Sequence, residues 1–355
     1  MKEILIIGPY PPLYSYGGPT RSIKGLYGAL SGENKCKVLS PKSHLNGKKI
    51  NIGLEDNDDI IYSDRPISYL IFNLKKDNIV WLNSFFELKI LFIIAISKIV
   101  KFKIIVSPRG QLSKEAINTS NPLIKKVFIR IIKILSSKLT FHSTDSNEMD
   151  DILKFFNRNR IFNIKNIFSL NNSRNDVFKA KFLFFSRIHK KKGLDILLDH
   201  LINSKIDISL DIYGFIEDTN YWEICKSKID LLKNVNYHGS IEDGDISVFK
   251  DKYSYFILPT LNENYGHIII ELISLGIIPI ISKGTTPFDD IINFMIGLNF
   301  DLTSSKDFKR VISKILKLEK NEVLSLKNNV EEIFMLLDQN QEDIKKDYIN
   351  LVKEL

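Results

Sequence analysis

Cysteine, histidine and long apolar runs are scarce in this chain, and each scarcity excludes a class of protein. The 355 residues include two Cys and six His, none at a metal-ligand spacing, so neither a disulfide framework nor a zinc site is expected. The longest apolar stretch, residues 88–100, contains Lys89 and Lys98 and falls short of the roughly 18 to 20 residues that cross a bilayer. With strand-like residues near the start and no secretory pattern, the sequence predicts a cytoplasmic protein with a buried helix at 88–100.

The sequence has no dinucleotide-binding fingerprint and only weak signals for a metal site. A Gly-x-Gly-x-x-Gly fingerprint for dinucleotides is missing, which argues against an oxidoreductase. The two Asp-x-Asp triplets, residues 56–58 and 243–245, lie in polar loops where Asp commonly forms turns and helix caps. We therefore expect no bound metal.

Basic residues outnumber acidic ones. The 50 Lys and Arg against 42 Asp and Glu give a net charge of +8. This balance fits attraction to phosphorylated small molecules or to an anionic membrane, although a coding bias toward Ile, Lys and Asn would produce it too. Residues 124–137 read as a basic amphipathic helix, which also fits an anionic surface. No base-stacking or helix-turn-helix signature indicates a nucleic-acid partner.

The chain is too long for one ordinary core, and strand and helix patterns alternate along it. The clearer strands of the first half are residues 3–7, 79–82, 103–106 and 139–142, and the pattern starts again at Lys181. A polar, turn-rich run at 171–176 separates the halves. The sequence predicts two Rossmann-like α/β domains, residues 1–172 and 173–340, followed by a helix at 341–355.

The most informative segment joins a strand to a helix in the second half. Residues 253–258 are aromatic and β-branched, and Pro259 ends that strand. A helix is predicted over 265–275, with Gly266 at its start and Gly276 just past its end. The free N–H groups at the start of such a helix can hold a diphosphate or sugar hydroxyls.

Two carboxylates mark this segment. Glu263 lies in the loop and Glu271 in the helix, eight positions apart, which separates them by roughly 80° on one helix. They therefore have different roles rather than forming a dyad. The alternative is that Glu263 only complements the helix dipole and Glu271 is a surface charge.

Residues 181–198, KFLFFSRIHKKKGLDILL, place Arg187 at a strand end and Lys192 at a helix start. Arg grips phosphate oxygens in a bidentate manner, and Lys supplies a point charge that stabilises a departing diphosphate. A solvated charge run is the alternative interpretation.

Three loops of the first half add weaker candidates. Gly17 and Gly18 precede a helix at 20–30 that carries Arg21, and their backbone can approach a ligand closely, although plain loop chemistry explains them too. Arg109 follows a strand and can hold an acceptor hydroxyl or a phosphate, or form a buried ion pair. His142 ends another strand, where a structural histidine is the commoner finding.

Four segments of the chain, in order, resemble those of the family 4 retaining glycosyltransferases, which have the GT-B fold. They are residues 10–21, YPPLYSYGGPTR, residues 105–112, IVSPRGQL, residues 181–198, and the E-x7-E segment from Glu263 to Glu271. The second is similar to a subset that builds bacterial surface polysaccharides such as O-antigen or capsule. Where many relatives have a His, this chain has Arg109, and residues 169–172 match the family's Pro-Asn-Gly segment only loosely.

The resemblance implies two Rossmann-like domains facing an interdomain cleft, with the last helix packed on the first domain. It implies transfer of a hexosyl unit, with retention, from a UDP- or GDP-sugar to a lipid-linked oligosaccharide at the inner face of the membrane, without a metal or other cofactor. A lipid-linked acceptor in turn implies peripheral contact of the protein with the anionic membrane. The implied catalytic and donor-binding residues are Gly17, Gly18, Arg187, Lys192, Glu263, Asn264, Tyr265, Gly266 and Glu271.

Two other functions remain open at this point. A glycoside hydrolase also uses two carboxylates, but it needs no Arg and Lys pair for a diphosphate. A noncatalytic sugar-nucleotide binding protein would share the site and lack turnover.

Overall fold

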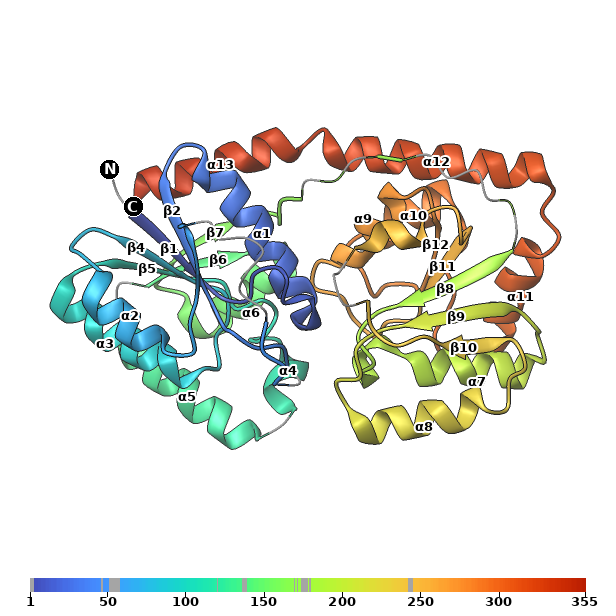
Figure 1. Ribbon diagram of the computed structural model, residues 1–355, viewed down its shortest axis with the longest axis horizontal. Coiled ribbons are helices and arrows are strands. Elements are labelled where there is room, and N and C mark those ends of the chain that lie inside the picture. Colours follow the sequence, from blue (N-terminus) through green and yellow to red (C-terminus); the bar gives the residue numbers. More distant parts are fainter. Residues whose placement is uncertain are drawn as a thin grey trace. The chain divides into compact units, whose positions relative to one another are not determined.

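The computed structural model (Figure 1) describes residues 3–45, 47–50, 58–119, 121–135, 139–168, 170, 172–173, 178, 180–241 and 245–355. The chain forms two compact units, Met1–Phe168 with Gln341–Leu355 and Ser169–Asn340. Most of the expected linker, residues 171 and 174–176, lies outside the described part. No helix among the described residues is long and apolar enough to cross a bilayer.

The first unit has a seven-stranded, wholly parallel sheet in the order β3-β2-β1-β4-β5-β6-β7. Its strands are β1 (Glu3–Ile7), β2 (Lys35–Ser40), β3 (Ile60–Tyr62), β4 (Ile79–Leu82), β5 (Lys103–Val106), β6 (Thr140–Ser143) and β7 (Arg160–Asn163). Its α-helices are α1 (Gly18–Ser31), α2 (Pro66–Asn73), α3 (Leu88–Val100), α4 (Lys114–Asn118), α5 (Pro122–Leu135), α6 (Ser146–Phe156) and α13 (Gln341–Glu354).

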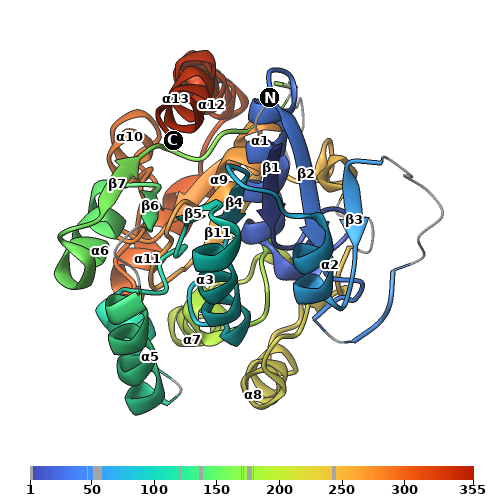
Figure 2. The ribbon, with the colours of Figure 1, turned by 90° about the vertical axis from the view of Figure 1, so that its left-hand side faces the viewer.

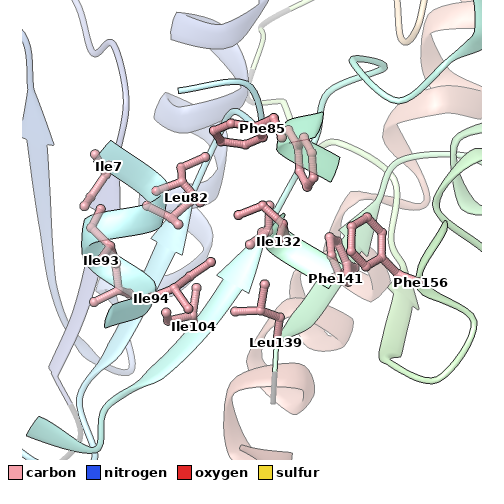
Figure 3. Close-up of a cluster of buried hydrophobic side chains, with 14 of the residues drawn as sticks. Ile7, Leu82, Phe85, Ile93, Ile94, Ile104, Ile132, Leu139, Phe141 and Phe156 are labelled. Atoms are coloured by element: carbon pink, nitrogen blue, oxygen red, sulfur yellow. The ribbon is translucent and has the colours of Figure 1, made fainter. Parts of the chain in front are cut away.

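Helices cover both faces of this sheet because the strands are apolar on both sides. Along β1, Leu5 and Ile7 pack with α2, α3, α5 and α6, in the cluster shown in Figure 3. Ile4 and Ile6 point to the other face and pack with α1 and α13. The last helix of the chain is therefore part of the core of the first unit.

The second unit has a five-stranded parallel sheet in the order β10-β9-β8-β11-β12. Its strands are β8 (Lys181–Phe185), β9 (Ser209–Tyr213), β10 (Val235–Tyr237), β11 (Tyr255–Leu258) and β12 (Ile278–Ile281). Its α-helices are α7 (Leu194–Ser204), α8 (Thr219–Ile229), α9 (His267–Ser274), α10 (Asp289–Met295), α11 (Ser305–Ile315) and α12 (Lys320–Asp338).

Both sheets are doubly wound, so each has a point where the direction of strand addition reverses. The reversal lies between β1 and β4 in the first unit and between β8 and β11 in the second. Loops at the carboxyl ends of the two strands beside such a point diverge and leave room for a ligand. The predicted α/β architecture of Rossmann-like domains is thus confirmed.

Two differences from the sequence-based expectation concern α9 and α3. The helix expected from residue 265 begins at His267, because Gly266 has φ +76°, outside the helical region. The helix at 88–100, α3, was expected to be buried, but it buries only one side through Ile90, Ile93 and Ile94. Its Ile99 is 81% exposed.

Candidate functional site

The candidate site lies at the reversal point of the second sheet. The loop after β8 carries Lys192, and the loop after β11 carries Glu263. Because the strands are parallel neighbours, their carboxyl ends lie at the same edge. The two side chains meet there, 71 positions apart in sequence.

Lys192 and Glu263 form a nearly buried ion pair. The ammonium donates to Oε1 of Glu263 at 2.5 Å, and the two side chains are 12% and 9% exposed. Burial alone would raise the pKa of Glu263, but the charges of Lys192 and Lys191 and hydrogen bonds from Lys192 and Thr260 outweigh it and lower the pKa. Glu263 is therefore a carboxylate at neutral pH.

The backbones of the two loops touch each other. Gly193 has φ +67°, and a Cβ built on it would lie 2.0 Å from the carbonyl oxygen of Pro259. Next to this contact, the N–H of Leu261 donates to the carbonyl of Lys191 at 2.9 Å. Only glycine fits at residue 193. Because it has no side chain, the two loops can touch, and this contact places Lys192 next to the acidic loop.

Hydroxyl groups support the carboxylate, and the sequence analysis missed them. Thr260 is fully buried, and its Oγ1 donates to Oε1 of Glu263 at 3.0 Å. Ser282, after β12, donates to the carbonyl of Thr260 at 2.7 Å. The N–H of Glu263 donates to the carbonyl of Thr285 at 2.7 Å. The available signal was a Ser or Thr within two residues of the end of each of two buried strands, Thr260 after β11 and Ser282 after β12.

Arg187 has a different partner. Its Nη1 donates to Oε2 of Glu217, in the loop after β9, at 2.8 Å, and both side chains are about one-third exposed. Arg187 and Lys192 are thus held by two separate carboxylates. Glu217 was not among the sequence-based candidates.

The helix that follows Glu263 begins beside an aromatic group. Tyr265 packs against His267 and Phe288, with ring centroids 4.8 and 5.8 Å away. Glu271 is 9% exposed, four residues into α9. The alternative of a surface charge is therefore wrong for Glu271. Asn264, half-buried, completes the loop.

The glycine loop of the first unit caps a helix. Gly17 has φ +68° and precedes α1, which begins at Gly18. Arg21 lies in the first turn with its guanidinium 5.7 Å from the ring centroid of Tyr14. The loop is closed by Thr20, whose hydroxyl donates to the carbonyl of Leu13 at 2.7 Å.

Arg109 lies at the carboxyl ends of β4, β5 and β7. Its guanidinium donates to Oδ1 of Asn166 at 2.6 Å and to Oδ1 of Asn83 at 2.7 Å. Burial lowers its pKa. The neighbouring N–H of Gly110 donates to Glu148 at 2.6 Å, which gives that carboxylate a structural role. Arg109 therefore binds two amide oxygens rather than a carboxylate, unlike the expected ion pair.

His142 is fully buried in the first unit. Its Nδ1 lies 2.9 Å from Oγ of Ser107, and its Nε2 lies 3.0 Å from the carbonyl oxygen of Ile164. Burial and the charge of Arg109 lower its pKa well below 6.5, so the ring is neutral at physiological pH. The expected sugar contact is corrected: His142 packs against Trp81 and Tyr348 inside the core.

The metal candidates are largely outside the structure. Residues 56–57 and 243–244 of the two acidic triplets are not among those described. Within the described ranges, no group of three or more His, Cys, Asp or Glu is placed to hold a metal ion.

The second unit matches a known family. Residues 168–333 fit the family model described as Glycosyl transferases group 1, which spans nearly the whole of this unit. The protein is a glycosyltransferase. Comparison of the enzyme with curated proteins gives no match.

Solved structures similar to the enzyme share its fold. The sucrose-phosphate synthase of Thermosynechococcus elongatus gives a TM-score of 0.78 at 14% identity, over 100% of this chain and 99% of that chain. HepE of Anabaena, solved in complex with UDP-glucose, gives 0.73 at 12% identity over 100% of both chains. A glycosyltransferase of Rickettsia africae gives 0.62 at 15% identity over 99% and 98%. The fold of the enzyme is GT-B.

Proposed function

We propose that the enzyme transfers a hexosyl unit from a UDP- or GDP-sugar to a lipid-linked saccharide, with retention of anomeric configuration. The observation that carries this proposal is the Lys192–Glu263 pair at the reversal point of the second sheet. A buried cation at such a point suits a leaving group with about two negative charges. The complex of HepE with UDP-glucose supports a nucleotide-sugar donor on the same fold.

The donor would bind at the second unit through two basic groups. Lys192 would stabilise the diphosphate as it leaves, and Arg187 would exchange part of its contact with Glu217 for phosphate oxygens. The backbone at Gly266 would approach the donor closely. Neither role needs a metal ion, and we propose a metal-independent reaction.

The acidic residues would position the sugar and the nucleotide. Glu263, together with Asn264 and Tyr265, would accept hydrogen bonds from sugar hydroxyls, since its carboxylate is ionised and its Oε1 is held by Lys192 and Thr260. Glu271 would hold the ribose. In the first unit, Gly17 and Gly18 would approach the donor, and Arg21 would contact the acceptor.

The state of Glu263 argues against a role for it as the general acid of a glycoside hydrolase. A hydrolase needs one carboxyl group with a raised pKa to protonate the leaving oxygen. The pKa of Glu263 is lowered instead. Its carboxylate oxygen Oε1 accepts a hydrogen bond from the ammonium of Lys192, which favours the ionised form. We propose front-face attack, with the departing phosphate accepting the acceptor's proton. The setting would be O-antigen or capsule assembly at the inner face of the cytoplasmic membrane.

A donor panel tests this function. The enzyme is incubated with UDP- and GDP-sugars and a lipid-linked acceptor, release of the nucleoside diphosphate is measured, and the anomeric configuration of the product is determined by NMR. We expect release with one donor class and a retained configuration. Donor binding without release would establish the noncatalytic alternative.

The matched variants are Glu263→Ala and Glu332→Ala, the second at an exposed position of α12. We expect Glu263→Ala to lower turnover about 100-fold or more, because the donor sugar loses its positioning group. Glu332→Ala is expected to leave it unchanged. Equal turnover of the two variants would refute the role of Glu263.

A further inference from the structure

The outer side of three neighbouring helices in the first unit is unusually apolar. In Figure 2, α3 lies between α2 and α5, and all three pack on the same side of the sheet. Ten large hydrophobic side chains are exposed on them: Ile71, Phe72, Leu88, Phe92, Ile99, Leu123, Ile124, Val127, Ile131 and Ile134. Phe72 is 86% and Ile134 81% exposed. Soluble surfaces rarely gather apolar groups in this way.

Helix α5 is apolar on two opposite sides. Its buried side is formed by Phe128, Ile129 and Ile132. At 100° per residue, the exposed stripe of Leu123, Ile124, Val127, Ile131 and Ile134 is centred about 140° away from that side. An ordinary surface helix has one apolar side only. The outer stripe therefore serves something other than the core of this unit.

The charge on these helices has one sign. Helices α2, α3 and α5 have 8, 13 and 14 residues, with six Lys or Arg and no Asp or Glu, although 42 of the 355 residues are acidic. Lys126 and Arg130 are exposed and flank the apolar stripe of α5. Glu87, just before α3, pairs with Lys89. Cations beside exposed apolar groups match an anionic lipid interface.

We propose that the outer side of α2, α3 and α5 binds the surface of an anionic phospholipid bilayer. The apolar side chains would enter the boundary of the acyl chains, while Lys126 and Arg130 contact the lipid headgroups. No helix would need to cross the bilayer. The inference adds to the proposed function and does not depend on sugar transfer.

Flotation with vesicles tests the proposal. The full-length enzyme is mixed with vesicles of phosphatidylcholine, with or without one third phosphatidylglycerol, at low and high salt. We expect flotation with the anionic vesicles and its weakening at high salt. Absence of flotation with anionic vesicles at low salt would overturn the proposal.

Exposed residues allow variants that leave the core intact. Replacing Ile124, Val127 and Ile134 by Ser is expected to lower partitioning about tenfold or more. Lys126→Gln with Arg130→Gln is expected to lower it about fivefold per cation. The control is Ile224→Ser with Leu231→Ser, two exposed apolar positions at α8 and just after it in the second unit, which should float like the unchanged enzyme.

Two further readouts separate membrane binding from misfolding and from dimerisation. Thermal unfolding and donor turnover without vesicles should be the same in all variants, so a failure of the proposed transfer is seen independently of membrane binding. Light scattering without vesicles should give the same mass for each variant. Equal flotation of the α5 variants and the control would overturn the proposal, and so would loss of a dimer in the α5 variants alone.

Discussion

The Lys192–Glu263 pair combines a structural and a chemical role in one contact. Taking two opposite charges out of water is costly unless they meet in good geometry and have further hydrogen bonds. Here Thr260 supplies such a bond to the carboxylate. Removal of either partner would leave the other charge nearly buried, so the pair is expected to contribute to stability as well as to the reaction.

The lowered pKa of Glu263 predicts a pH-dependent difference in stability. A depressed pKa in the folded state stabilises the protein above the ordinary value of 4.5, and this contribution is lost as the pH falls through the lower, folded-state value. Urea unfolding of the unchanged enzyme and of Glu263→Gln should therefore show a difference at pH 7 that disappears in acid. A difference that stays constant or grows below pH 4.5 would contradict the assigned ionisation.

Sequence reasoning identified charged residues better than their partners. Arg187 and Lys192 were predicted as a joint phosphate site, yet Arg187 pairs with Glu217, 30 positions away. Likewise, Arg109 binds Asn83 and Asn166, 26 and 57 positions away. Strand order decides which of these side chains lie close together. Local patterns in the sequence do not encode strand order directly.

The loop between β8 and α7 owes its position to a single glycine. Gly193 combines a positive φ with a close approach to Pro259, whereas Gly239 has φ +84° and open space where a Cβ would lie. The two positions therefore separate backbone strain from steric overlap. Their comparison shows how far the site depends on contact between its two loops.

We predict that Gly193→Ala is much more damaging than Gly239→Ala. The change at Gly239 costs about 1 to 2 kcal/mol, the strain of a left-handed L-residue. The change at Gly193 adds an overlap at 2.0 Å with a carbonyl oxygen, so the loops must separate and Lys192 moves relative to Glu263. Urea unfolding and donor turnover measure both effects. Similar losses at the two positions would argue against the loop contact.

Strands and helices were predictable where one pattern dominated. The strands β1, β4 and β5 lie at the expected residues because short apolar, β-branched runs are bounded by turns. The start of α9 was placed two residues too early, because helical spacing does not reveal the positive φ of Gly266. Helix α3 was expected to be buried, since hydrophobicity alone does not distinguish a buried helix from one with an exposed apolar side.

The segment after the second unit, residues 341–355, belongs to the first unit. Helix α13 places Ile344, Tyr348, Ile349, Leu351 and Val352 in that unit's core. The hydroxyl of Tyr348 also donates to the carbonyl of Lys165 at 3.1 Å. The core of the first unit is therefore completed only by the end of the chain.

Removal of residues 341–355 should destabilise one unit selectively. Each large apolar side chain contributes about 1.5 to 3 kcal/mol when buried, so the loss is comparable to the whole stability of a typical domain. Calorimetry should show the transition of the first unit lowered or lost, with that of the second unit unchanged. An equal shift of both transitions would contradict this division of the chain.

We propose that the nearly buried ammonium of Lys192 recognises the donor's diphosphate. Calorimetric titration of UDP and GDP is the most direct test, applied to the unchanged enzyme, Lys192→Met, and Lys190→Met as an exposed neighbouring control. The double variant Lys192→Gln with Glu263→Gln preserves the fold by keeping a neutral hydrogen bond. We predict about tenfold or weaker binding in both Lys192 variants and unchanged binding in the control. Undiminished binding by the folded double variant would contradict the claim.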